Sequence, residues 1–369
     1  MTRRRRGRFL LAGLLLFALL MGTAAASGSE ALDQQDKALG IDKLEKAGSQ
    51  TEVTMGEGLN EGLQNILDAC GDTVGGVARK AVRSGVLLLV IVLLCGLAET
   101  TRACGSEPGG SLDAVTIAGA LAITAVAVGD AHSLIGFGRG AIDNMENFSK
   151  VLLPTMASVT AAGGAPTGAV ARQMATLLFS DILMTLINRL LLPLVYTYLA
   201  ACVAYAAVGN GGLRQIAGFL KWTIATILTA VMVIFVGYLT ISGVIAGSAD
   251  AAAVKAAKFT VSSMVPVVGS VLSDAAETVL AGAGILKNTV GVFGMLVVLS
   301  LCVIPFLQLG IHYLAYKLTA ALSATVAEGR ISSLISDIGG AFGLVLGMMG
   351  ACALLLLVSL VSAVSMVMP

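Results

Sequence analysis

The stretch AAKFTVSSMVPVVGSVLSDAAETVLAGAGILKNTV, residues 256–290, lies between two long apolar segments but is itself only half apolar. At helical spacing its polar residues fall along one stripe and its apolar residues along the other. The stretch is too polar to span a bilayer and too apolar to be an ordinary solvated segment. We therefore predict an amphipathic helix that either lies in the lipid headgroup region or turns its polar face toward a water-filled path within a bundle.

The composition of the whole chain indicates the class of protein. Of its 369 residues, 57% are hydrophobic and only 12% are charged, and the mean hydropathy is +0.91. These values are typical of an integral membrane protein. The net charge of +1 argues against a nucleic-acid partner, because phosphate binding needs a concentrated basic face and the dense basic cluster is confined to Arg3–Arg6. We expect an all-α, polytopic protein whose surroundings are the lipid bilayer.

The apolar segments predict about seven or eight membrane segments, with amphipathic interfacial helices in addition. The segment at 151–163 contains Pro154 and is followed by a stretch rich in glycine and proline at 163–167. It is either a half-helix whose free backbone groups are covered by protein, or one arm of a helical hairpin with a tight turn, which we favour. The segments lie at 84–98, 114–129, 151–163, 174–187, 190–208, 222–247, 290–311 and 340–368.

The amino terminus has the pattern of a secretory signal peptide. Arginines at Arg3–Arg6 precede an apolar run at 9–21, and small residues follow up to Ala26. Because a run of about 13 residues is short for a spanning helix, cleavage after Ala26 is favoured over an uncleaved anchor. The predicted parts are a signal peptide at 1–26, a polar extracytoplasmic segment at 27–83, and a multi-pass helical membrane domain at 84–369 with its amphipathic stretch at 251–289.

An acidic residue interrupts the mainly apolar stretch 174–208. Asp181 lies seven and eight residues before Asn188 and Arg189, so all three share one helix face. An ionisable group inside a membrane is costly and usually faces water or a partner. The three residues therefore form either an intramembrane polar track in a conduit or an interfacial turn before Pro193, with Asp181 paired to Arg189 or to a neighbouring helix.

Two carboxylates, Asp274 and Glu277, are three residues apart on the polar stripe of the opening stretch. Paired carboxylates can perform acid–base chemistry only in a pocket that shifts their pKa values, and the sequence gives no sign of such a pocket. We favour solvated or partner-facing charges. Together with Lys287 and Asn288, they are our candidates for assembly or gating.

Small residues recur every four positions in the last apolar segment. At this spacing two helix backbones can approach closely, and such packing stabilises helix pairs in lipid. We predict a helix-packing face that joins two helices of one chain or two copies of the chain. Its members are Gly339, Gly343, Gly347 and Ala351.

The sequence carries none of the common enzyme signatures. It has no H-E-x-x-H, G-x-S-x-G or G-x-x-x-x-G-K-[ST] motif. Its six cysteines are scattered without a C-x-x-C pair, and it contains only two histidines, whereas a metal site needs clustered ligands. We predict a non-enzymatic protein without a catalytic residue, a metal or a cofactor.

The chain contains the strings AIDNMENFSKVLLPTMASVTAAGG (141–164), LPLVY (192–196), AKF (257–259), PVVG (266–269), the D-x-x-E-T-V run (274–279), LKNTVG (286–291) and YKLTAAL (316–322). Together they resemble the signature of the stage III sporulation protein AE family. The resemblance implies a membrane subunit of the channel or secretion-like apparatus that links mother cell and forespore in endospore development. It further implies a place in the mother-cell membrane around the forespore, and as partners the other membrane proteins of the same sporulation operon, a secretion-type ATPase subunit and intermembrane ring proteins. The small-residue face allows a homo-oligomer in addition. A stand-alone small-solute permease is the alternative.

Overall fold

The computed structural model describes residues 40–103, 114–162, 166–264, 269–326 and 329–365. This part of the chain is helical and contains no strand, which confirms the all-α class. The elements in chain order are α2 (Ile41–Gly48), α3 (Leu59–Ala103), α4 (Ala114–Ala162), α5 (Pro166–Leu186), the π-helical turn η1 (Ile187–Leu191), α6 (Leu192–Val208), α7 (Gly211–Met264), α8 (Gly269–Ser323) and α9 (Gly329–Ser365).

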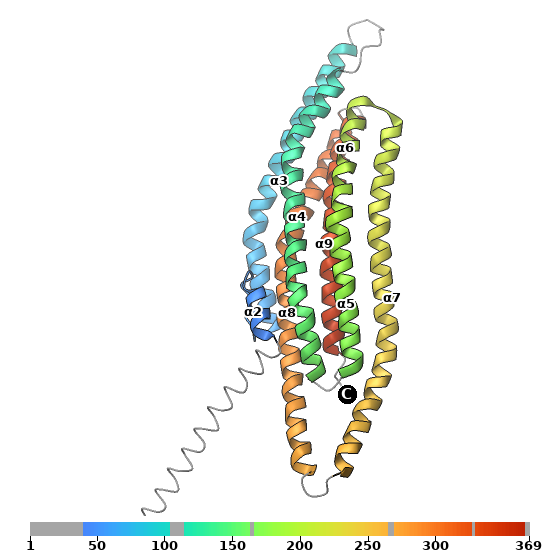
Figure 1. Ribbon diagram of the computed structural model, residues 1–369. Coiled ribbons are helices and arrows are strands. Elements are labelled where there is room, and N and C mark those ends of the chain that lie inside the picture. The colour runs from blue at the N-terminus through green and yellow to red at the C-terminus, as the bar shows by residue number, and fades with distance from the viewer. Residues whose placement is uncertain (1–39, 104–113, 163–165, 265–268, 327–328, 366–369) are drawn as a thin grey trace, which may run out of the picture.

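The helices form one elongated bundle in which consecutive long helices run antiparallel (Figure 1). The longest, α7 and α8, contain 54 and 55 residues. At 1.5 Å per residue each is about 80 Å long, whereas the hydrocarbon core of a bilayer is about 30 Å thick. The bundle therefore spans a membrane and also extends well beyond it.

Six helices in the described part are long and apolar enough to cross a membrane. The predicted count of about seven or eight is only approximate, because two pairs of predicted segments are each one continuous rod in the described part. The segments at 114–129 and 151–163 both belong to α4, and those at 174–187 and 190–208 join through η1. The chain is a multi-pass membrane protein.

The half-helix alternative at 151–163 is wrong, since α4 runs through Pro154 to Ala162. Proline removes one backbone donor from a helix, but this part of α4 is held by its packing: Leu152, Leu153 and Met156 are fully buried. Helix α5 begins four residues after α4 ends and runs back beside it (Figure 1). This arrangement is the helical hairpin that we favoured.

Helix α3 crosses the predicted segment boundary at residue 83 without interruption. Before it, α2 packs against the bundle, because Ile41 and Leu44 are buried. A Cβ at Gly48, the last residue of α2, would lie only 2.6 Å from the ring of Phe293 on α8. Residues 41–103 therefore belong to the bundle rather than to a separate unit.

The core lies where α4, α8 and α9 meet. Phe148 and Phe293 form an edge-to-face pair with ring centroids 6.5 Å apart, and Leu152 packs into the space left by Gly294. By contrast, α7 is peripheral: 11% of the residues in its most apolar 18-residue stretch are buried, compared with 56% in the corresponding stretch of α9. The outer face of α7 is thus the surface most open to lipid or to another protein.

The described residues of the stretch 256–290 belong to two helices, because α7 ends at Met264 and α8 begins at Gly269. Residues 265–268 lie outside the described part. The side chains at 241–287 lie outside the described part, so the predicted amphipathic stripe stays a prediction.

Candidate functional site

The site is built around η1, the π-helical turn between α5 and α6. The backbone N–H of Leu192 donates to the carbonyl of Ile187, five residues earlier. Pro193 follows at the start of α6 and cannot donate to the carbonyl four residues before it, so a widened turn is one way for the helix to continue. The predicted interfacial turn before Pro193 is therefore wrong, because the helix passes through this point without reversing.

Asn188 projects from the widened turn toward two carboxylates on α4. Its Nδ2 donates to Oδ1 of Asp143 at 2.8 Å and to Oε2 of Glu146 at 3.4 Å. Its Oδ1 is buried and has no hydrogen-bond partner in the described part of the chain. A buried, unpaired amide oxygen is uncommon and is available to a water or to another polar group.

The charged side chains of α4 form a stripe along one face. Arg139, Asp143, Glu146 and Lys150 are spaced by four, three and four residues, which keeps them on the same side of the helix. Arg139 Nε lies 3.7 Å from Asp143 Oδ2, and Lys150 Nζ lies 2.6 Å from Glu146 Oε1. Each acid therefore has a basic partner one turn away. We call these four residues together with Asn188 the α4–η1 polar cluster.

The α4–η1 polar cluster lies at the level of the apolar core. Phe148, two residues after Glu146, stacks edge-to-face on Phe293. The charge of Glu146 also acts on Cys352, a buried residue of α9. The side chains of Arg139 and Lys150 are 61% and 52% exposed, whereas that of Glu146 is 19% exposed, so the cluster extends from the edge of the core to the surface of the bundle. Two acids and two bases balance each other here, and the amide of Asn188 connects α5–α6 to α4.

The side chains of Asp181 and Arg189 are both exposed. The charge of Asp181 acts on Lys150 of α4, although no ion pair joins the two. The structure thus brings Asn188 into the polar cluster and leaves Asp181 within electrostatic reach of it. A polar track through the bundle stays a prediction.

The assembly or gating candidates lie on the hairpin formed by α7 and α8. Asp274, Glu277 and Lys287 are in α8, but their side chains are outside the described part. Asn288 is exposed. Their proposed role stays a prediction.

The small residues of α9 have different neighbours. A Cβ at Gly339 would lie 3.0 Å from Cβ of Tyr316, and one at Gly343 would lie 3.0 Å from the ring of Tyr313, both on α8. At Gly347 the nearest atom, on Leu228 of α7, would be 3.8 Å away, and Ala351 is buried. Two of the four positions are thus close contacts between α8 and α9 within one chain.

Sequence reasoning missed the two carboxylates of α4 as site residues, although both lie in the string 141–164. Their signal was available: Arg139, Asp143, Glu146 and Lys150 recur at helical spacing between apolar segments. Treating 114–129 and 151–163 as separate segments hid the charges in the supposed loop between them.

Comparison with known proteins gives the family. The family described as stage III sporulation protein AE matches residues 51–367. The stage III sporulation protein AE of Bacillus subtilis (strain 168) is 24% identical over 213 residues, which cover 58% of this chain and 53% of that relative. The match thus spans about half the length of the relative, and no solved structure matches. Because the family match covers most of the chain, this multi-pass membrane protein belongs to the stage III sporulation protein AE family.

Proposed function

We propose that the chain is a non-enzymatic membrane subunit of the channel or secretion-like apparatus that links mother cell and forespore. Its place is the mother-cell membrane around the forespore, and its task is to hold other subunits at that membrane. Membership of a sporulation family and the multi-pass bundle support this proposal. The partners we propose are the other membrane proteins of the operon, a secretion-type ATPase subunit that supplies the energy, and intermembrane ring proteins.

The observation that carries the proposal is the projecting hairpin of α7 and α8. In Figure 1 both helices continue past the ends of α5 and α9 at one end of the bundle. A helix pair that leaves the bundle in this way offers surface to other proteins on one side of the membrane. Asp274, Glu277 and Lys287 lie on this hairpin, which favours assembly over chemistry for them.

The α4–η1 polar cluster also favours a non-enzymatic role. Each of its carboxylates already has a basic partner, at 3.7 Å for Asp143 and at 2.6 Å for Glu146. A general acid or base needs a side chain that can exchange a proton with a bound substrate. Paired charges that connect α4 to η1 are better suited to fixing the helices of a scaffold.

A second candidate, the stand-alone permease, draws support from the same cluster. Charged side chains that lead from the surface to the edge of the core and the unpaired amide oxygen of Asn188 are features of a hydrated path. The two functions differ in one measurable respect. A permease moves its solute when it is reconstituted alone into liposomes, whereas an assembly subunit is inert alone and co-purifies with its partners.

The experiment replaces Asp274 and Glu277 together with alanine in a sporulating host. We expect fewer heat-resistant spores and loss of the sister membrane proteins from the affinity-purified complex, with the amount of the protein in the membrane unchanged. The matched control, Glu61→Ala with Asp68→Ala, removes the same charge from exposed positions on α3. Normal sporulation and an intact complex in the hairpin variant would contradict the assembly role.

A further inference from the structure

A second polar cluster lies where α6, α7, α8 and α9 meet, near the end of the bundle that carries the connections 209–210 and 324–328. The hydroxyl of Tyr198 on α6 donates to Oδ1 and to the carbonyl oxygen of Asp337 on α9, both at 3.3 Å. Nζ of Lys317 on α8 donates to Oγ of Ser336 at 2.8 Å. With Lys221 of α7, these residues form what we call the four-helix junction, and it shares no residue with the α4–η1 polar cluster.

Lys221 reaches from α7 into a notch on α9. A Cβ at Gly340 would lie 3.7 Å from Nζ of Lys221 and 3.3 Å from the hydroxyl of Tyr198. The missing side chain at Gly340 therefore makes the space into which the ammonium group extends. No hydrogen bond or ion pair joins Lys221 to another residue in the described part of the chain.

The four-helix junction holds more positive than negative charge. The ammonium of Lys317 is acted on by the positive charge of Lys221 and by the negative charge of Asp337. One carboxylate thus faces two ammonium groups, and neither lysine forms an ion pair with it among the described residues. Lys221 is exposed, and Lys317 is half-buried and bonded to a neutral hydroxyl, so an anion that approaches the junction meets two ammonium groups that one carboxylate does not neutralise.

The surroundings of Lys221 are those of a membrane interface. The next residue, Trp222, is 62% exposed, and its ring lies 6.0 Å from that of Phe219, which is equally exposed. Tryptophan next to lysine at a helix end is typical of the headgroup level. Lys221 is about 15 Å along α7 from the start of that helix at 1.5 Å per residue. A headgroup can therefore reach it from the outer side of α7, across the helix axis.

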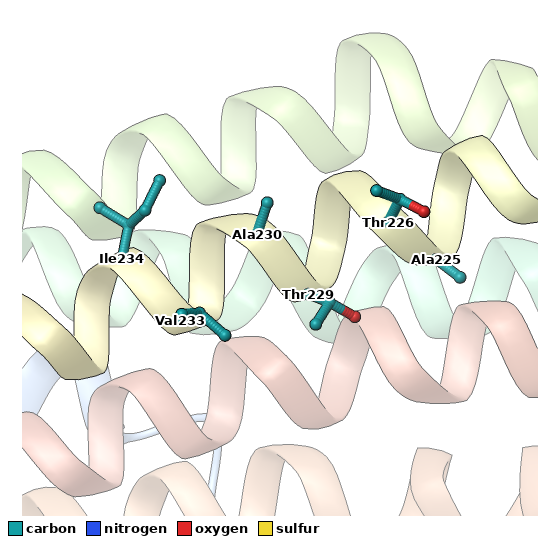
Figure 2. A pocket seen from close by; sticks show the side chains of 6 residues that line it. All are labelled: Ala225, Thr226, Thr229, Ala230, Val233 and Ile234. Carbon is teal, nitrogen blue, oxygen red and sulfur yellow. The ribbon is translucent and has the colours of Figure 1, made fainter.

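An apolar hollow begins one helical turn after Lys221. It is a shallow hollow of about 520 Å³ that is open to the outside and runs along the exposed face of α7 (Figure 2). Figure 2 shows Ala225, Thr229 and Val233 on the side of α7 toward α9, which is also the side where Lys221 meets Gly340. The lining consists of Ala225, Thr226, Thr229, Ala230, Val233 and Ile234.

We propose that Lys221 and Lys317 bind the phosphate of an anionic phospholipid, whose acyl chain lies in the hollow on α7. The two ammonium groups neutralise the phosphate, and the hydroxyl of Tyr198 lies beside it. The exposed aromatic rings at Phe219 and Trp222 fix the depth of the headgroup. Basic pockets between membrane helices are known to suit such headgroups, and the small side chains below leave room for a chain.

The test measures lipid retention by the purified full-length protein with native mass spectrometry. Phosphatidylglycerol is compared with phosphatidylcholine of the same acyl chains, for the wild type and for Lys221→Gln with Lys317→Gln. With a contribution of about fivefold for each lysine, the double variant should lose on the order of 25-fold in preference for phosphatidylglycerol. The charge-conserving pair Lys221→Arg with Lys317→Arg should keep that preference, and the control Lys80→Gln, an exposed lysine on α3, should not change it.

Two further arms separate the parts of the proposal. Ala225→Leu should weaken retention of long-chain phosphatidylglycerol but not of a short-chain form, because it fills only the hollow. Excess inorganic phosphate should not displace the long-chain lipid. The proposal is overturned if the double glutamine variant keeps its lipid preference, which would leave the lysines for an acidic partner protein. It is also overturned if inorganic phosphate fully displaces the long-chain lipid.

Discussion

Replacing Asn188 with aspartate tests whether the α4–η1 polar cluster holds the bundle together. The substitution keeps the shape of the side chain but exchanges a donor for a third negative charge. In the native protein this donor lies 2.8 Å from a carboxylate oxygen of Asp143 and 3.4 Å from one of Glu146. The variant therefore loses both hydrogen bonds and gains repulsion from both acids.

The two effects differ in size. In membrane proteins a side-chain hydrogen bond between helices contributes about 0.6 kcal/mol on average and at most about 1.7 kcal/mol. A pair of like charges about 4 Å apart costs about 4 kcal/mol at an effective dielectric constant of 20. We expect Asn188→Ala to lower the free energy of unfolding by about 1 kcal/mol and Asn188→Asp to lower it by more than about 3 kcal/mol, since Arg139 and Lys150 offset only part of the repulsion.

The assay is unfolding of the purified protein in mixed micelles by a denaturing detergent, followed by circular dichroism. Asp181→Asn is the control, because it alters an exposed acid of the same rod that makes no hydrogen bond with Asn188. The exchanged pair Asp143→Asn with Asn188→Asp restores a donor opposite an acceptor and should recover most of the stability. If Asn188→Asp were no less stable than Asn188→Ala, the cluster would not be the tight contact described here.

Two further predictions concern the contacts of α8. Gly339→Leu should destabilise the protein by about 1–3 kcal/mol through overpacking, because even a Cβ would lie 3.0 Å from Cβ of Tyr316. The control Gly347→Leu should change little in the same unfolding assay, since the atom nearest to a Cβ there is 3.8 Å away. Equal effects at both positions would contradict the close packing at Gly339. Tyr316→Phe removes the 2.8 Å hydrogen bond to Oδ2 of Asp130 on α4 and should lower the free energy of unfolding by about 1–2 kcal/mol. If the double variant Tyr316→Phe with Asp130→Ala is no less stable than Asp130→Ala alone, this hydrogen bond is the source of the loss. Additive losses in the double variant would refute that assignment.

Periodicity and composition determined the class of the protein. Apolar runs of membrane length can satisfy their backbone groups in lipid only as helices, so the all-α bundle was predictable from the amino-acid sequence alone. The family also followed, since its strings lie in order between residues 141 and 322. The number of spans did not follow, because Pro154 and Pro193 break helices in many contexts but here sit inside packed rods.

The candidate site was only partly readable from the sequence. Asn188 was identified by its polarity within an apolar stretch. Its partners Asp143 and Glu146 were not, because they lie more than 40 residues away and a single sequence does not say which helices touch. The same holds for Lys221 and Lys317, which the chain separates and α9 brings together.

The amino-acid sequence by itself decided that this chain is a helical membrane protein and that some of its polar residues lie within apolar segments, because hydrophobicity and helical spacing are local properties. Only the tertiary structure decided which polar side chains of different helices meet, as Asn188 meets Asp143 and Glu146. Pairing depends on the rotation and offset of whole helices, and these are set by close contacts such as Gly339 with Tyr316 and Gly294 with Leu152. Packing of that kind is a property of the assembled bundle, and no segment carries it alone.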